Sequence, residues 1–242
     1  MLLLRFLTDC IHQSNFEQVK QNAKKVFIEK PGLVDTELTT NIYVGYVLRH
    51  APCIAYLKDK IADQDIKRIK VEIRANTVLE QGSGWRASAK GGGVVNEFGS
   101  HAINLAKYLA TDEYTITDYQ TEQVVSRDCP DKCAIQGSTE SGTAIEIHLN
   151  WSDASVRKPT YLVEVELADG NTYATDFFQV WCDNGEQQKT DITGVASWEN
   201  RCAFYIRGLE FSEQARYFSD HNDFTQDLLD SIFTDRILGQ TT

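Results

Sequence analysis

Continuous apolar runs dominate the first part of the chain. "KVFIE" (residues 25–29) and "NIYVGYVL" (residues 41–48) lack the polar alternation of a half-exposed strand, and this is typical of parallel strands covered on both faces. Residues 2–7 predict another strand, and "SNFE" (residues 14–17) is a capping-box pattern that predicts a helix to about Lys24. Strand, helix, strand, strand is a piece of a doubly wound sheet, although it is too short to be a whole one.

The period of the pattern changes after residue 50. Ile54, Leu57 and Ile61 have helical spacing, whereas residues 66–75 alternate strictly and predict a strand. "GGGVVNEFGSHAINLAKYL" (residues 91–109) predicts a glycine loop that runs into an amphipathic helix.

The rest of the chain is rich in short alternating segments separated by turns. This pattern predicts an antiparallel sheet with one exposed face, with strands within residues 113–126, 134–139, 143–152, 161–180 and 202–208. "ADGNT" (residues 168–172) predicts a tight hairpin, because Asp-Gly supplies the positive φ values that such a turn needs. Phe224, Leu228 and Ile232 predict a closing helix.

We therefore predict an α/β plus α+β fold in two parts. Residues 1–48 form the C-terminal remnant of a parallel α/β sheet. Residues 49–242 form an α+β domain with one large, mostly antiparallel open sheet and flanking helices.

Composition narrows the classes of partner. The 242 residues carry 24 Lys and Arg against 35 Asp and Glu, a net charge of -11, which argues against binding nucleic acid or an anionic membrane surface. The six cysteines are dispersed in a chain too long to need a disulfide framework, and "MLLLRFLTDC" lacks the basic start of a signal peptide. No stretch approaches the roughly 18 apolar residues of a membrane span. We expect a cytoplasmic protein.

Glu97 and His101 are the first candidates for chemistry. They are spaced i, i+4 on the predicted helix, so the carboxylate can orient the imidazole or raise its pKa, as suits a general acid or base near neutral pH. The three glycines at residues 91–93 allow another group to approach the backbone closely. The alternative is a solvated Glu–His pair on a helix surface.

Lys30 is the second candidate, at the end of a predicted parallel strand. Open α/β sheets bind their ligands at this edge, and partial burial of a lysine suits it to proton transfer or to polarising a hydroxyl. The alternative is a solvent-exposed lysine paired with Glu29.

Two other patterns carry less weight. "GSGWRA" (residues 82–87) matches a dinucleotide fingerprint only in part, because no acidic residue follows a second strand at the required distance. Cys129 and Cys133 have three residues between them, where a zinc or redox pair usually has two, and no second pair follows. We expect no metal site.

Taken together, "VFIEKPG", "YVGYVLRHAP" and "WRASAKGGGVVNEFGSHAINLAKYL" resemble the glucose–fructose oxidoreductase, inositol dehydrogenase and MocA family over most of the chain. The resemblance implies an N-terminal Rossmann domain for NAD or NADP. It also implies a C-terminal domain whose large sheet binds a sugar-type substrate and builds homo-oligomers. Members mostly oxidise or reduce a hydroxyl carbon of sugars, cyclitols or nucleotide-linked sugars, and a minority are NAD-dependent glycosidases.

The resemblance also implies roles for individual residues. Lys30 matches a lysine that contacts the substrate hydroxyl near the nicotinamide, and His101 matches the acid/base histidine. Glu97 stands where the family usually has aspartate, and Arg49 matches an arginine just after the last Rossmann strand, near the substrate. The resemblance further implies that a group of residues contacts or lies near the cofactor: Glu29, Lys30, Pro31, His12, Trp85 and Arg86.

The departures from the family leave alternatives open. Only 29 residues precede Lys30, and no G-x-G-x-x-G occurs, so the sequence resembles an N-terminally truncated member that we expect to be inactive alone. The alternatives are a non-catalytic relative that binds a sugar or a partner, and an NAD-dependent glycosidase of the same fold. The sequence names neither the sugar nor the choice between NAD and NADP.

Overall fold

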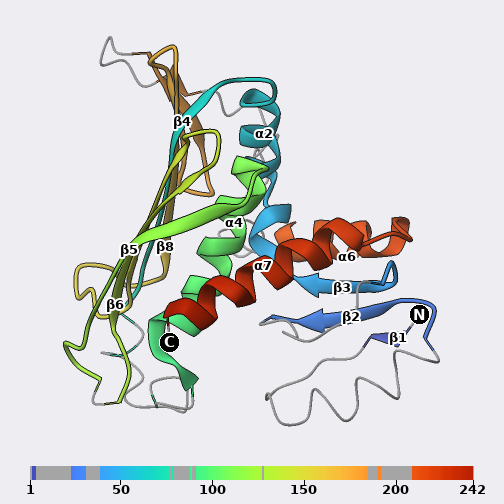
Figure 1. Ribbon diagram of the computed structural model, residues 1–242, viewed down its shortest axis with the longest axis horizontal. Helices are drawn as coiled ribbons and strands as arrows, with labels where there is room; N and C mark the ends of the chain where they lie inside the picture. The colour runs from blue at the N-terminus through green and yellow to red at the C-terminus, as the bar shows by residue number, and fades with distance from the viewer. Residues whose placement is uncertain are drawn as a thin grey trace.

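In the computed structural model, two sheets lie on either side of a group of helices (Figure 1). The structure describes residues 2–3, 23–30, 39–76, 78, 88, 91–126, 128–184, 190–191 and 209–241. The predicted helix at residues 14–24 and the predicted strand at residues 202–208 fall almost entirely outside this part.

The large sheet has eight strands in the order β11-β10-β9-β8-β4-β7-β6-β5. Only the central pair β4 and β7 is parallel, and the other neighbours are antiparallel. The bounds are β4 (Ile66–Arg74), β5 (Tyr114–Glu122), β6 (Lys132–Thr139), β7 (Ala144–Asn150), β8 (Thr160–Leu167), β9 (Thr172–Thr175), β10 (Val180–Asp183) and β11 (Thr190–Asp191). The predicted large and mostly antiparallel sheet is confirmed.

The period-2 pattern sorts the side chains of this sheet onto two faces. Ile69, Val71 and Ile73 of β4 are buried against the helices, together with the aligned apolar residues of β7 and β8. Each such aliphatic side chain contributes roughly 1.5–3 kcal/mol by leaving water. The alternate residues form ion pairs across strands on the other face, such as Lys70 with Glu164 at 3.3 Å.

The small sheet is parallel and contains β1 (Leu2–Leu3), β2 (Val26–Glu29) and β3 (Ile42–Gly45). The prediction of one strand over residues 41–48 was wrong at its C-terminal end, because β3 stops at Gly45. Glu29, the last residue of β2, pairs with Gly45, so no neighbouring strand extends farther to pair with. A 3-10 helix, η1 (Val47–His50), follows directly.

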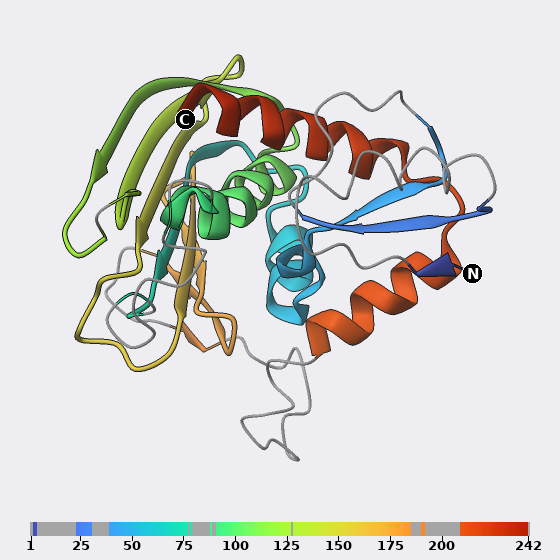
Figure 2. The same ribbon diagram turned by 90° about the horizontal axis from the view of Figure 1, so that it is seen from below.

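The helices connect the two sheets (Figure 2). α2 (Pro52–Lys60) and α4 (Ser100–Ala110) lie between them, and a π-helix, η4 (Val95–Gly99), leads into α4. α6 (Leu209–Asp220) packs beside η1, while α7 (Thr225–Thr241), the predicted closing helix, packs on both β3 and α4. Nine of the eleven α4 residues are buried, so α4 is the central helix of the described structure.

The predicted hairpin at residues 168–172 joins β8 to β9. Gly170 has φ +93, whereas Asp169 is not among the residues with positive φ, so the glycine alone supplies the special geometry. The boundary predicted between residues 48 and 49 stays a prediction.

Candidate active site at the start of helix α4

Lys30 follows β2 directly and lies at the C-terminal edge of the parallel sheet. Its Nζ donates a hydrogen bond of 2.8 Å to the backbone carbonyl of Glu97 and lies 3.9 Å from the Glu97 Oε2. The side chains of Lys30 and Glu97 are 14% and 31% exposed, so the ammonium group is largely but not fully withdrawn from water. Two residues that lie 67 positions apart in sequence are therefore in direct contact.

Glu97 lies within η4 rather than within regular α-helix. A π turn closes i→i+5 hydrogen bonds and is wider than an α turn, and such turns occur often at functional sites. The i, i+4 reasoning for Glu97 and His101 assumed regular helix throughout, so the pair does not have the geometry assumed from the sequence. His101 itself lies in the first turn of α4.

His101 packs beside the ring of Tyr46, which connects β3 to η1. The two ring centroids are 6.3 Å apart with an edge-to-face angle of 87°. Tyr46 is only 1% exposed, and this burial, followed by the charge of Asp235, raises the pKa of its hydroxyl above the usual value. Tyr46 is thus a neutral wall on one side of the candidate site.

The glycine loop approaches another part of the protein itself. Gly92 and Gly93 both have positive φ, and a Cβ on Gly93 would lie 2.5 Å from the carbonyl oxygen of Pro130. The amide of Val94 donates to the same carbonyl at 3.1 Å. The close approach expected from the sequence is therefore made by the β5–β6 loop of the large sheet.

Asp131 anchors that loop. Its Oδ2 accepts hydrogen bonds from the backbone amides of residues 124–126 at 2.6–2.9 Å, and its Oδ1 accepts one from Trp151 Nε1 at 3.2 Å. These bonds hold the pKa of the fully buried carboxyl below its usual value despite burial, and Trp151 packs edge-to-face on Phe98, next to Glu97. The large sheet therefore braces the segment that carries the candidate residues.

Arg49 lies apart from this cluster, toward the other end of α4. Its guanidinium is 5% exposed and forms ion pairs with Asp230 at 3.0 Å and with Asp227 at 3.4 Å. It also lies over the ring of Tyr108 at 5.6 Å. Its predicted contact with substrate stays a prediction, and both carboxylates were missed from the sequence because they lie about 180 positions away.

The predicted cofactor residues divide between the described and the undescribed part of the chain. Glu29 ends β2 and is half-buried beside Lys30. His12, Pro31, Trp85 and Arg86 lie outside the described residues, so their roles stay predictions.

No group of three or more metal-ligating side chains occurs within the described ranges. Cys129 and Cys133 are both buried there as free cysteines, and burial raises the pKa of the Cys133 thiol to about 12. Cys133 is therefore a packed thiol at neutral pH.

The fold and the sequence both indicate one class of protein. In this class a parallel α/β sheet is followed along the chain by a domain with one large open sheet. The family model "GFO/IDH/MocA C-terminal domain" matches residues 55–185, which is more than half of the chain. The chain belongs to the Gfo/Idh/MocA family.

Solved structures share the fold at low identity. An NAD-binding oxidoreductase from Klebsiella pneumoniae has a TM-score of 0.79 at 14% identity, covering 98% of this chain and 76% of that one. UDP-N-acetylglucosamine 3-dehydrogenase from Acidithiobacillus ferrooxidans has a TM-score of 0.69 at 16% identity, with 99% and 77% covered. A levoglucosan dehydrogenase solved with NADH and L-sorbose has a TM-score of 0.75 at 11% identity, with 100% and 78% covered. No curated protein matches the chain.

None of the helices in the described ranges is long and apolar enough to cross a membrane.

Proposed function

We propose that this chain serves NAD(P)-dependent oxidation or reduction at a hydroxyl carbon of a sugar, a cyclitol or a nucleotide-linked sugar. The observation that carries the proposal is the contact between Lys30, at the edge of the parallel sheet, and Glu97, one turn before His101. Family membership and the names of the similar structures support the same reaction class.

The three residues have separate roles in this proposal. His101 accepts the proton of the substrate hydroxyl, because a neutral imidazole is a base suited to neutral pH. The Lys30 ammonium donates a hydrogen bond to the same oxygen and stabilises the negative charge that develops there. Glu97 holds Lys30 in place through its carbonyl and adds a nearby carboxylate.

The described residues fit the reacting end of a nicotinamide cofactor, because Lys30 and Glu29 lie at the sheet edge where open α/β folds bind nucleotides. The cofactor would supply the hydride acceptor or donor. The chain contains no G-x-G-x-x-G to cradle a pyrophosphate. We therefore propose that the chain alone binds cofactor weakly.

We also propose that the large sheet forms a homo-oligomer. None of the described helices covers its outer face, and the charges there pair within the sheet, such as Arg68 with Glu146 at 3.2 Å. A face whose charges cancel can meet a second copy without repulsion.

The test has two stages. Titration of NADH and NADPH into the purified chain, followed by calorimetry, measures cofactor binding directly. Turnover of sugar and cyclitol alcohols is then measured in a version of the protein extended by a dinucleotide-binding segment, where Lys30→Met should lose a factor of roughly 10²–10⁴.

Lys58→Met is the matched control, because Lys58 is also partly buried and also donates to a backbone carbonyl, that of Tyr108 at 2.6 Å. It should keep wild-type turnover. Turnover of Lys30→Met within tenfold of the wild type would remove Lys30 from the mechanism. Absence of cofactor binding at millimolar concentrations would rule out catalysis by this chain alone. Sugar release without net NADH formation would indicate a glycosidase instead.

A further inference from the structure

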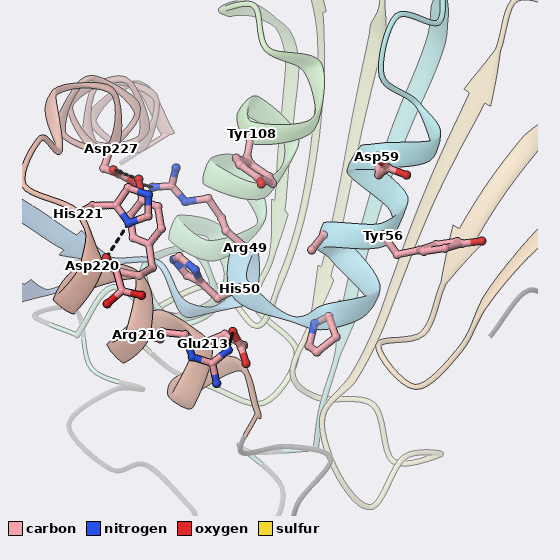
Figure 3. Close-up of a pocket in the computed structure, with 13 residues that line it drawn as sticks. Arg49, His50, Tyr56, Asp59, Tyr108, Glu213, Arg216, Asp220, His221 and Asp227 are labelled. Carbon is pink, nitrogen blue, oxygen red and sulfur yellow. Dashed lines mark hydrogen bonds and ion pairs between the residues drawn. The ribbon is translucent and has the colours of Figure 1, made fainter. Parts of the chain in front are cut away.

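A cavity of about 720 Å³ is lined by residues of η1, α2, α4, α6 and α7 (Figure 3). This volume is within the roughly 300–1,000 Å³ that small-molecule sites occupy. Figure 3 shows side chains of α6 on one side, Asp59 of α2 on the other, and Tyr108 of α4 between them. We call this space the α2–α6 cavity.

The α2–α6 cavity is separate from the candidate active site. Tyr108 lies seven residues after His101 on α4, roughly 10 Å along the helix axis. The buried ring of Tyr46 lies 6.3 Å from the His101 ring and 5.8 Å from the Arg49 guanidinium, and it lines no part of the cavity. Lys30 and His101 are not among the lining residues.

A hydrogen-bond relay fixes the tautomer of His50, which lines the cavity. Gln214 Nε2 donates to the buried Tyr43 hydroxyl at 3.1 Å, so the hydroxyl proton goes to His50 Nε2 at 2.7 Å. Burial and the neighbouring charges of Arg49 and His221 lower the pKa of His50 to about 4, so the ring is neutral at neutral pH. Its remaining proton lies on Nδ1, which His50 can donate to a ligand.

His221 lines the cavity with the opposite polarity. Its Nδ1 donates to the Tyr217 carbonyl at 2.9 Å, which leaves Nε2 as an acceptor when the ring is neutral. The ring stacks on Tyr217 with centroids 4.1 Å apart. The cavity therefore presents a donor from His50 and an acceptor from His221.

Charge further restricts the ligand. In the inner wall the positive Arg49 is balanced by the carboxylate of Asp227, which also accepts a hydrogen bond of 2.9 Å from Tyr217. At the rim, Glu213 pairs with Arg216, and the exposed Asp59 and Asp220 add negative charge. An anionic ligand would meet these carboxylates, which disfavours it.

A cationic ligand is disfavoured by the inner wall. The carboxylates of Asp227 and Asp230 are already paired with Arg49, and the ring of Tyr108 already has two cations over it, Arg49 at 5.6 Å and Lys58 at 5.1 Å. Hydroxyl groups fit this wall better, because each can accept from a donor such as His50 and donate to an acceptor such as Asp227.

From this arrangement we propose that the α2–α6 cavity is a second binding site, for a neutral polyhydroxylated molecule of about monosaccharide size. The site does not depend on the proposed proton transfer, because Lys30, Glu97 and His101 are not among its lining residues.

Binding is measured by saturation-transfer NMR and calorimetry with D-glucose and myo-inositol as neutral probes. D-glucosamine and D-glucuronate are charged analogues of matched size. Ala55→Trp fills the cavity from the exposed face of α2 without removing any contact. Ala215→Trp, at an exposed position of α6 outside the cavity, is the matched control.

We expect a neutral probe to bind the wild type and to lose at least about tenfold in affinity with Ala55→Trp, equivalent to about 1.4 kcal/mol. Ala215→Trp and His101→Ala should bind as the wild type does. The proposal is overturned if no neutral probe binds at millimolar concentrations, or if a charged analogue binds more tightly. It is equally overturned if Ala55→Trp has no effect, or if His101→Ala abolishes binding, which would place the probe in the candidate active site.

Discussion

The two ends of helix α4 are built differently although they belong to one buried helix. The first turn carries His101 and follows Glu97, whose side chain is 31% exposed and whose carbonyl accepts from Lys30. The last turns carry Lys107 and Tyr108, which contact the buried ion cluster of Arg49, Asp227 and Asp230.

The difference separates chemistry from stability. Charges in the C-terminal cluster are nearly dry and form ion pairs with one another, so they fix how α7 and η1 pack on α4. Charges at the N-terminal end keep contact with water and lie at the edge of the parallel sheet, where a substrate can reach them. Substitutions at the C-terminal end of α4 should therefore change stability, and those at its N-terminal end should change activity.

Arg49→Met should have the largest effect on stability. It leaves Asp227 and Asp230 buried without their main cation, which should lower the free energy of unfolding by about 3–5 kcal/mol. Urea denaturation measures this. Arg74→Met removes a surface arginine that is 44% exposed and should cost less than about 1 kcal/mol. Equal costs for the two variants would contradict the contrast between the ends of α4.

His50 should make stability depend on pH, because burial lowers its pKa in the folded protein from about 6.5 to about 4. Between these values the unfolded chain binds a proton that the folded protein does not bind, so stability falls as the pH drops from 6.5 to 4. The loss should be up to roughly 3 kcal/mol. Denaturation of wild type and His50→Gln across this range measures it, and the same slope in both would show that other groups are responsible.

The difference between Gly93→Ala and Gly170→Ala should be the smallest of these effects and should test the loop beside the active site. Gly93 and Gly170 both have positive φ, so alanine at either costs about 1–2 kcal/mol in backbone strain. Only at Gly93 does the new Cβ meet a backbone oxygen at 2.5 Å, whereas nothing lies within 4 Å at Gly170. Gly93→Ala should therefore cost about 1–2 kcal/mol more than Gly170→Ala in urea denaturation. Equal costs would mean that the β5–β6 loop moves away from the new Cβ without a measurable loss of stability.

The sequence predicted the elements that depend on local period. The alternation of residues 66–75 gives β4, and the glycines followed by an apolar stripe give the loop and α4. Period alone does not specify partners, so the parallel pairing of β4 with β7 in an otherwise antiparallel sheet was not foreseen.

The same limit holds for the site residues: local patterns identify candidates but not the distant residues that they contact. The contact of Lys30 with the Glu97 segment agrees with the resemblance, which treats these motifs as one site. The π-helix and the ion pairs of Arg49 depend on packing between distant segments, and no local pattern at residues 49, 97, 227 or 230 indicates them.

The most direct test of the division along α4 is the turnover of His101→Gln in the version extended by a dinucleotide-binding segment, at matched folded fraction. The substitution keeps a polar side chain of similar length but removes the base. We expect turnover to fall by roughly 10²–10⁴ while the free energy of unfolding stays within about 1 kcal/mol of the wild type. Turnover within tenfold of the wild type, or a loss of stability as large as that of Arg49→Met, would contradict the assignment of chemistry to this end of the helix.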